Sequence, residues 1–218
     1  MMEARPAVVI GIVAGVATAA SAGSPSFFGD RGAFETAAAG AGVPLDGFES
    51  FENFPADDGE FFAELDADGF TVTSRDVNFD FLDPITVQEQ ASGGFPTDGD
   101  QLLSISSFDF TETTFTFDAP VFAAGLDLID FGDFQGITST IEGSINGGER
   151  FTIFDGTGTS GNTAFFGVVS GSAISTLTIF NNFDGDQYGI DAVSFGVPTP
   201  GTAGLLALGG LAAARRRR

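Results

Sequence analysis

The sequence predicts an all-β fold, an antiparallel β-sandwich of jelly-roll type with one short N-terminal helix. About ten segments of five to nine residues are rich in Thr, Val, Ile and Phe, and clusters of Gly, Asp, Asn or Pro separate them. Polar and apolar residues alternate strictly in 114–117 and 176–179, which predicts strands with one buried and one solvent-facing side. No helical pattern of ~10–15 residues recurs between these segments, which argues against a parallel α/β sheet.

The predicted helix covers residues 30–40, where alanines favour a helical backbone, Asp30 is an N-cap and Gly40 a C-terminal stop. Residues 50–66 mix acids and phenylalanines without a clean period, so this segment is predicted to be a long loop. Strands follow it. Their predicted ranges are 70–74, 85–90, 101–107, 114–118, 125–131, 137–145, 150–156, 164–171, 174–180 and 189–195.

The charge of the chain is strongly unbalanced. It carries 30 acidic residues against eight arginines and no lysine, a formal net charge of -22 at pH 7. Residues 23–196, the predicted sandwich domain, contain only Arg31, Arg75 and Arg150 as basic residues. Such a surface repels nucleic acid and anionic lipid and attracts cations, which excludes DNA or RNA as a partner of the folded part. The same excess of acids would also serve solubility alone.

The first 22 residues have the layout of a secretory signal peptide. Arg5 supplies a basic start, residues 7–17 are an apolar run, and the small residues Ala20 and Ala22 form a cleavage site. The alternative is an uncleaved membrane anchor, but the apolar run is shorter than the ~20 residues that a spanning helix needs. We therefore expect export of a domain that has no cysteine and relies on its apolar core.

Residues 197–218 form a separate tail with three parts. The first part is a rigid, extended stretch, Pro198, Thr199 and Pro200, which neither helix nor sheet readily crosses. Residues 202–214 could form a transmembrane-type helix about 20 Å long, short of the ~30 Å hydrocarbon core of a bilayer. The last part is a basic cluster, Arg215, Arg216, Arg217 and Arg218, expected to stay on the cytoplasmic side.

These parts, in this order, resemble the PEP-CTERM sorting tail of bacterial envelope and extracellular-matrix proteins. Pro198 and Pro200 match its two prolines and the four arginines match its basic end, while Thr199 stands where the family usually has Glu. The resemblance covers about 22 of the 218 residues. It implies passage through the Sec machinery and signal peptidase, and cleavage near Pro200 by an exosortase-like membrane protease. It also implies transient membrane contact through the tail, a location in the cell envelope or extracellular matrix, and exopolysaccharide as a candidate partner.

The absence of His, Cys and Lys excludes most catalytic devices, including a Ser-His-Asp triad, a thiolate, a Schiff base and an imidazole or thiolate zinc site. A pair of carboxylates, as in glycoside hydrolases, remains open, but no catalytic residue is predicted. The main prediction is a non-catalytic protein with a structural or adhesive role. The alternative is a secreted module that binds or hydrolyses carbohydrate through carboxylates. The single Tyr and the absence of Trp count against that alternative.

Calcium is the one ion that the residues favour, because it binds through oxygen atoms alone. Asp191 shares strand parity with Val193 and Phe195 and is expected to face the core, near a first strand that carries Glu49. The predicted ligands of a structural calcium ion are Glu49, Asp184, Asp186 and Asp191. The alternative places these carboxylates at exposed strand ends among hydrated turns. No other cofactor is predicted.

A second acidic stretch, residues 64–70, resembles the start of an EF-hand loop. Position twelve of that loop would be Arg75, where a bidentate Glu is required. An EF-hand is therefore excluded, and a polar turn is predicted instead.

Overall fold

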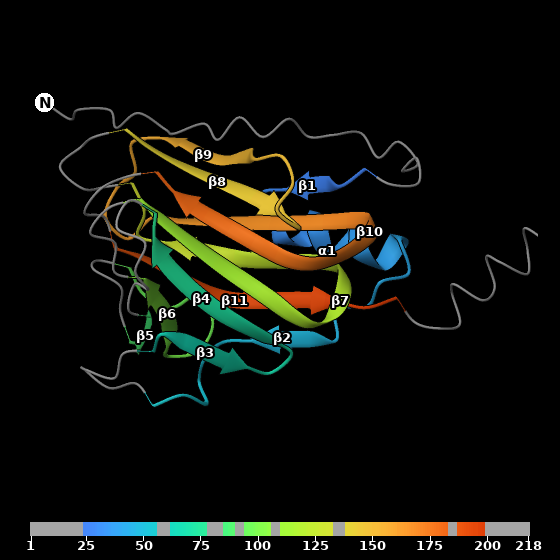
Figure 1. Ribbon diagram of the computed structural model, residues 1–218, viewed down its shortest axis with the longest axis horizontal. Helices are drawn as coiled ribbons and strands as arrows, with labels where there is room; N and C mark the ends of the chain where they lie inside the picture. The colour runs from blue at the N-terminus through green and yellow to red at the C-terminus, as the bar shows by residue number, and fades with distance from the viewer. Residues whose placement is uncertain are drawn as a thin grey trace, which may run out of the picture.

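The computed structural model describes residues 24–55, 62–77, 85–89, 94–105, 110–132, 138–182 and 187–198 (Figure 1). In chain order its elements are β1 (Ser26–Phe28), α1 (Arg31–Gly40), β2 (Gly47–Glu49), β3 (Glu64–Ala67), β4 (Phe70–Asp76), β5 (Ile85–Gln88), β6 (Leu102–Ile105), β7 (Thr111–Ile129), β8 (Ser139–Ile145), β9 (Phe151–Gly156), β10 (Thr163–Asn181) and β11 (Tyr188–Gly196). Within these described ranges no helix has the length and apolar character needed to cross a membrane.

Two long strands, β7 and β10, connect the two layers of the molecule. Each has 19 residues, and they pair antiparallel from Thr163 opposite Ile129 to Asn181 opposite Thr111. The register is interrupted between Val169 and Thr176 of β10, and such irregularities bend a strand pair. The two halves of this curved pair therefore belong to different layers (Figure 1).

The first layer has the strand order β3-β4-β7-β10-β8-β9, in which β4 pairs with residues 111–117 of β7 and β8 with residues 177–181 of β10. The second layer has the order β5-β6-β11-β7-β10-β1, in which β11 pairs with residues 123–129 of β7. The short strand β2 adds to β11 beside β6. All of these pairings are antiparallel, so the predicted class, an antiparallel sandwich with one short helix, is confirmed.

Phenylalanines join the two layers in the core. Phe70 is fully buried, and its ring centroid lies 5.6 Å from that of Phe115, 6.2 Å from Phe117 and 5.7 Å from Phe195. The first three rings belong to the first layer and the fourth to β11 of the second layer. Aromatic pairs at these separations stabilise a core beyond the area that they bury.

The helix α1 packs on the outer face of the second layer (Figure 1). Asp30 is its N-cap, as predicted, and accepts a hydrogen bond of 2.8 Å from the amide of Ala33. Phe34 is fully buried against Phe165. A side chain at Gly167 of β10 would collide with the Phe34 ring, so this glycine permits the close approach of helix and sheet. This packing brings the first turn of α1 to the candidate site.

The sequence patterns underestimate the length of the two central strands. Residues 114–118 and 125–131 were expected as separate strands and lie in one strand, β7. Residues 164–171 and 174–180 likewise lie in β10. The intervening residues look like breaks in the pattern because the chain curves there from one layer to the other.

The segment predicted as a long loop, residues 50–66, is partly structured. Phe62 forms a bridge to Ile85, and Glu64 begins β3, which pairs with β4. Where a polar turn was predicted, in residues 64–70, only Asp68 and Gly69 form a turn, with Gly69 at φ 92°, because residues 64–67 are the strand β3. The three-residue strand β1 was not predicted, since it is too short to show alternation. The strand β2 lies where a first strand carrying Glu49 was expected.

Candidate functional site

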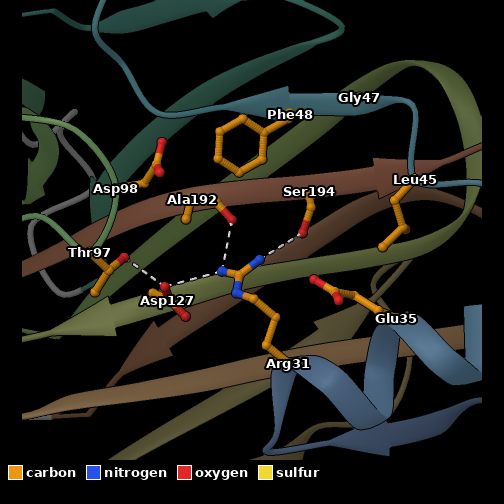
Figure 2. A pocket seen from close by; sticks show the side chains of 10 residues that line it. All are labelled: Arg31, Glu35, Leu45, Gly47, Phe48, Thr97, Asp98, Asp127, Ala192 and Ser194. Carbon is orange, nitrogen blue, oxygen red and sulfur yellow. Dashed lines mark hydrogen bonds and ion pairs between the residues drawn. The ribbon is translucent and has the colours of Figure 1, made fainter.

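A cleft lies on the outer face of the second layer, between α1, β2 and the turn before β6 (Figure 2). Its volume is about 470 Å³, within the range of small-molecule sites. The lining residues are Arg31, Glu35, Leu45, Gly47, Phe48, Thr97, Asp98, Asp127, Ala192 and Ser194. They come from five separate parts of the chain, and the fold alone brings them together.

Arg31, the first residue of α1, lines the cleft and connects three of its strand residues through hydrogen bonds and an ion pair. Its Nη1 donates to the hydroxyl of Ser194 at 3.2 Å, and its Nη2 donates to the carbonyl oxygen of Ala192 at 3.1 Å. Nη2 also forms an ion pair with Asp127 at 3.1 Å, and the guanidinium carbon lies 4.6 Å from the ring centroid of Phe165. The side chain is still 30% exposed, so part of the guanidinium group faces the cleft.

Two carboxylates face each other beneath this arginine. Asp127 of β7 and Asp191 of β11 lie directly opposite one another on adjacent strands, where like charges repel. The hydroxyl oxygen of Thr97 lies 2.6 Å from Oδ2 of Asp127 and 3.1 Å from Oδ2 of Asp191. It has one proton, so it donates to one of the two carboxylates at a time. Together with Arg31, it offsets the repulsion between them.

Asp191 is fully buried and holds a turn of the backbone in place. Its Oδ2 accepts hydrogen bonds from the amides of Thr97 at 2.7 Å and Asp98 at 2.8 Å, and its Oδ1 accepts from the amide of Ala192 at 2.6 Å. Burial raises the pKa of Asp191, and these backbone hydrogen bonds oppose the rise only in part. The carboxylate therefore positions the 97–98 turn at the edge of the cleft.

The raised pKa of Asp191 predicts a pH dependence of stability. Because the folded chain binds this proton more tightly than the unfolded chain, the contribution is fully present below the ordinary pKa of 3.8 and is lost as the pH rises through the raised value. Asn does not titrate, so the free energy of unfolding of the wild type relative to Asp191→Asn is expected to increase as the pH falls from about 7 to about 4. Urea unfolding of both chains across this window measures the difference. A difference that does not change with pH would contradict the prediction.

The open side of the cleft combines one aromatic ring with two exposed carboxylates. The side chain of Phe48 is 51% exposed, and Figure 2 shows Asp98 and Glu35 on either side of it, with Arg31 below. The ring offers a flat apolar surface, the carboxylates accept hydrogen bonds, and the guanidinium and hydroxyl groups donate them. This combination suits an uncharged ligand that has both hydroxyl groups and an apolar face.

The expectation that Asp191 faces the core is wrong, because a β-bulge interrupts the alternation of β11. The register with β7 slips by one residue between Asp191 and Ser194. Ala192, in the bulge, has φ 49°, a left-handed conformation that few residues with a side chain adopt. Beyond the bulge Val193 and Phe195 pack into the core, whereas Asp191 lies on the outer face beside Arg31.

Glu49 lies on the other face of the same layer. Its strand, β2, does lie beside the last strand, and Glu49 is opposite Val193, whose side chain faces the core. Glu49 is 6% exposed, and its Oε1 accepts a hydrogen bond of 2.6 Å from the amide of Phe51. The structure therefore does not bring Glu49 and Asp191 together.

The remaining predicted site residues lie outside the described residues, except Pro198, which follows β11 in irregular backbone. Those outside are the predicted calcium ligands Asp184 and Asp186, the cleavage-site residues Ala20 and Ala22, and the tail residues Thr199, Pro200, Arg215, Arg216, Arg217 and Arg218. Among the described residues, no group of three or more His, Cys, Asp or Glu side chains is arranged so that it could hold a metal ion. Calcium binding through Asp184 and Asp186 stays a prediction.

The main residues of the cleft were not predicted from the sequence. Arg31 offered a signal, since it is one of only three basic residues in the predicted domain. Asp127 offered another, because it is one of two acidic residues in the otherwise apolar segment 125–131. Thr97 and Phe48 gave no signal in the sequence, because their positions in the cleft depend on how a turn and a three-residue strand pack.

Comparison with known proteins gives weak structural likenesses only. No family model and no curated protein matches the chain. Among solved structures, it is similar to the K2 cleaved adhesin domain of Lys-gingipain, with 15% identity, a TM-score of 0.43, and coverage of 68% of this chain and 98% of that one. It is also similar to the C-terminal family 22 carbohydrate binding module of Clostridium thermocellum Xyn10B, with 13% identity, a TM-score of 0.40, and coverage of 71% of this chain and 94% of that one. A third similar structure is the K1 cleaved adhesin domain of Lys-gingipain from Porphyromonas gingivalis W83, with 13% identity, a TM-score of 0.40, and coverage of 70% of this chain and 98% of that one. At these scores the likeness carries no conclusion about function.

Proposed function

We propose that this chain is an exported protein of the cell envelope or extracellular matrix, whose sandwich has a non-catalytic, adhesive role and binds a neutral glycan in the cleft of Figure 2. The observation that carries the proposal is the exposed ring of Phe48 beside hydrogen-bonding groups from α1 and from the 97–98 turn. Export rests on the signal peptide and the tail in the sequence. Mass spectrometry of the native protein tests that part, because a chain that keeps residues 1–22 and the four terminal arginines would overturn it.

The chemistry of the cleft matches that of a sugar. A pyranose ring has hydroxyl groups at its rim and apolar C–H groups on its faces. The exposed carboxylates of Glu35 and Asp98 accept hydrogen bonds from hydroxyl groups, and Arg31 donates them. The ring of Phe48 has no polar atom, so a C–H face that covers it removes apolar surface from water at no polar cost.

The charge of the cleft favours an uncharged ligand. Arg31 is the one cationic group among the lining residues, and it faces Glu35, Asp98 and Asp127. The whole chain carries a net charge of -22, so an acidic polysaccharide would be repelled both at long range and at the site. Asp191, which could act as an acid or base because of its raised pKa, is buried and fully engaged by backbone amides, which supports a binding role over a hydrolytic one.

Native affinity electrophoresis in gels that contain soluble polysaccharides tests this function. We expect the chain to be retarded by at least one neutral polysaccharide and by none of the acidic ones. Phe48→Ala is expected to weaken that binding roughly tenfold or more, because it removes the aromatic surface that the sugar covers. Phe110→Ala is the matched control, because Phe110 is 39% exposed but lies just before β7, away from the cleft.

Two results would overturn the proposal. If the wild-type chain binds no neutral polysaccharide, the function is wrong. If it binds one but Phe48→Ala binds equally well, the ligand lies elsewhere on the surface and the cleft is not the site.

A further inference from the structure

The most exposed large hydrophobic side chain in the described part of the chain lies close to the cleft but does not line it. Phe95 is 66% exposed, against 51% for Phe48. It comes two positions before Thr97, a lining residue of the cleft. A single exposed apolar residue is common on protein surfaces, so exposure alone assigns no role to it. The way in which Phe95 is held sets it apart.

The backbone on both sides of Phe95 is fixed to the second layer. On one side, a side chain at Gly94 would collide with Ile129, so this glycine lies directly against the end of β7. On the other side, the amide of Thr97 donates a hydrogen bond of 2.7 Å to the buried carboxylate of Asp191. Phe95 therefore lies in a short segment that is anchored at both ends.

The residue that follows restricts this segment further. Pro96 has a fixed φ, and its ring keeps the residue before it in extended conformations. The backbone of Phe95 therefore has little freedom left to lose when a ligand covers its ring. A group held in this way binds more tightly than a mobile one, because less conformational entropy is lost on binding.

The two exposed aromatic rings belong to the same face of the second layer. Asp127 lines the cleft on the outer face, and Ile129 lies two residues further along β7, so it shares that face. Since Gly94 lies against Ile129, the anchored segment crosses the outer face. Phe48 of β2 lies opposite Ser194, which also lines the cleft. Both rings are therefore available to one ligand that lies along this face.

The strand pairing sets the spacing between the two rings. Phe48 is opposite Ser194 of β11, which is opposite Gly125 of β7. Gly94 lies at Ile129, four residues further along β7, which corresponds to about 13 Å along the strand. The two strand-to-strand steps from β2 to β7 add about 10 Å across the sheet. One sugar unit is too small to cover both rings, whereas a chain of several units can reach from one to the other.

We propose that Phe95 forms a second subsite for the glycan that binds at Phe48, so that the ligand is a chain of several neutral sugar units and not a single sugar. This inference rests on the proposed function of the cleft. The Phe95 ring has no polar atom, so the C–H face of a sugar that covers it removes apolar surface from water. Two contacts on one rigid face raise the affinity for a long chain above that of either contact alone, because the second forms within the complex.

Titration calorimetry of the full chain tests the proposal. The probe is whichever of dextran, mannan and a β-glucan retards the wild-type chain most in the affinity gels, together with its own fragments of increasing length. The affinity of the wild type is expected to rise with fragment length until both rings are covered. Phe95→Ala is expected to bind the polysaccharide roughly tenfold more weakly and the shortest fragments as the wild type does. Phe48→Ala is expected to weaken binding at every length.

Three controls accompany this comparison. Phe95→Tyr keeps the face of the ring and is expected to bind the polysaccharide as the wild type does. Phe110→Ala removes an exposed ring away from the cleft and is expected to change nothing. Because Phe95 is exposed, Phe95→Ala is expected to melt close to the wild-type temperature, so a loss of binding does not reflect unfolding.

Two results would overturn the second subsite while leaving the proposed function of the cleft intact. If Phe95→Ala binds the polysaccharide as tightly as the wild type while Phe48→Ala does not, Phe95 does not contact the glycan. In that case, self-association of the wild type that is lost in Phe95→Ala, measured by sedimentation, would identify the ring as a contact between copies of the chain. If Phe95→Ala weakens short and long fragments equally, the ring acts through the cleft and not as a subsite of its own. A wild-type chain that binds none of the polysaccharides would overturn the proposed function and this inference together.

Discussion

Phe34→Ala is expected to lower the free energy of unfolding by about 3–5 kcal/mol, the range for a fully buried aromatic residue. The Phe34 ring centroid lies 6.3 Å from that of Phe28 and 5.4 Å from that of Phe165. Gly125 and Gly167 of the sheet lie against this ring and have no side chains to fill the space. The cavity therefore cannot close easily, and a large loss follows. Urea or guanidinium unfolding at equilibrium measures it.

Phe34→Leu is the matched control, because it keeps most of the apolar volume and is expected to cost clearly less. The alanine variant is also expected to lose glycan binding in the proposed cleft, since Phe34 fixes the first turn of α1 and so the position of Arg31. A loss below about 1 kcal/mol for the alanine variant would mean that α1 does not depend on this contact.

Asp191→Ala is expected to lower the free energy of unfolding by about 2–4 kcal/mol, because it leaves three backbone amides without an acceptor. These amides belong to Thr97, Asp98 and Ala192, and Asp191 itself is fully buried. The variant also removes the cost of burying a carboxylate, which keeps the effect from being larger. Asp191→Asn keeps one acceptor oxygen and is expected to lose less. Chemical unfolding near neutral pH measures both.

The same loop supplies a control for this prediction. Oε1 of Glu52 accepts hydrogen bonds of 2.7 Å from the amides of Asp100 and Gln101, but this carboxylate is exposed. Water can replace it there, so Glu52→Ala is expected to have a much smaller effect than Asp191→Ala. Equal losses in the two variants would mean that burial of the Asp191 hydrogen bonds does not set their value.

The parts of the fold that depend on local pattern could be predicted from the sequence. The helix begins after Asp30 because that side chain accepts from an amide of the first turn, and residues 114–117 of β7 alternate in burial as expected. In β10 the expectation of one solvent-facing side is wrong, because residues 177–181 are buried on both faces. The continuity of β7 and β10 could not be predicted, because the bend between layers interrupts the alternation in the same way as a turn. Gaps in a pattern do not distinguish the two.

The candidate site could be predicted only in part, because a single extra residue changes which face a side chain occupies. Alternation along 191–195 placed Asp191 on the core side, and the bulge at Ala192 reverses that placement. The contact between Asp127 and Asp191 depends on the register of two strands that are 64 positions apart in sequence. Neither the bulge nor the register leaves a signal in a short window of residues.

The place of β11 has a consequence for how the chain acquires its fold. This strand, residues 188–196, is the last one described, yet it lies inside the second layer and pairs with β2, β6 and β7. Its partner β2 is more than a hundred residues away in sequence, a separation that slows folding because a long loop must close first. The second layer can therefore be completed only after nearly the whole domain has been synthesised. If the chain is exported unfolded, as proposed, the second layer can form only after its final strand has crossed the membrane.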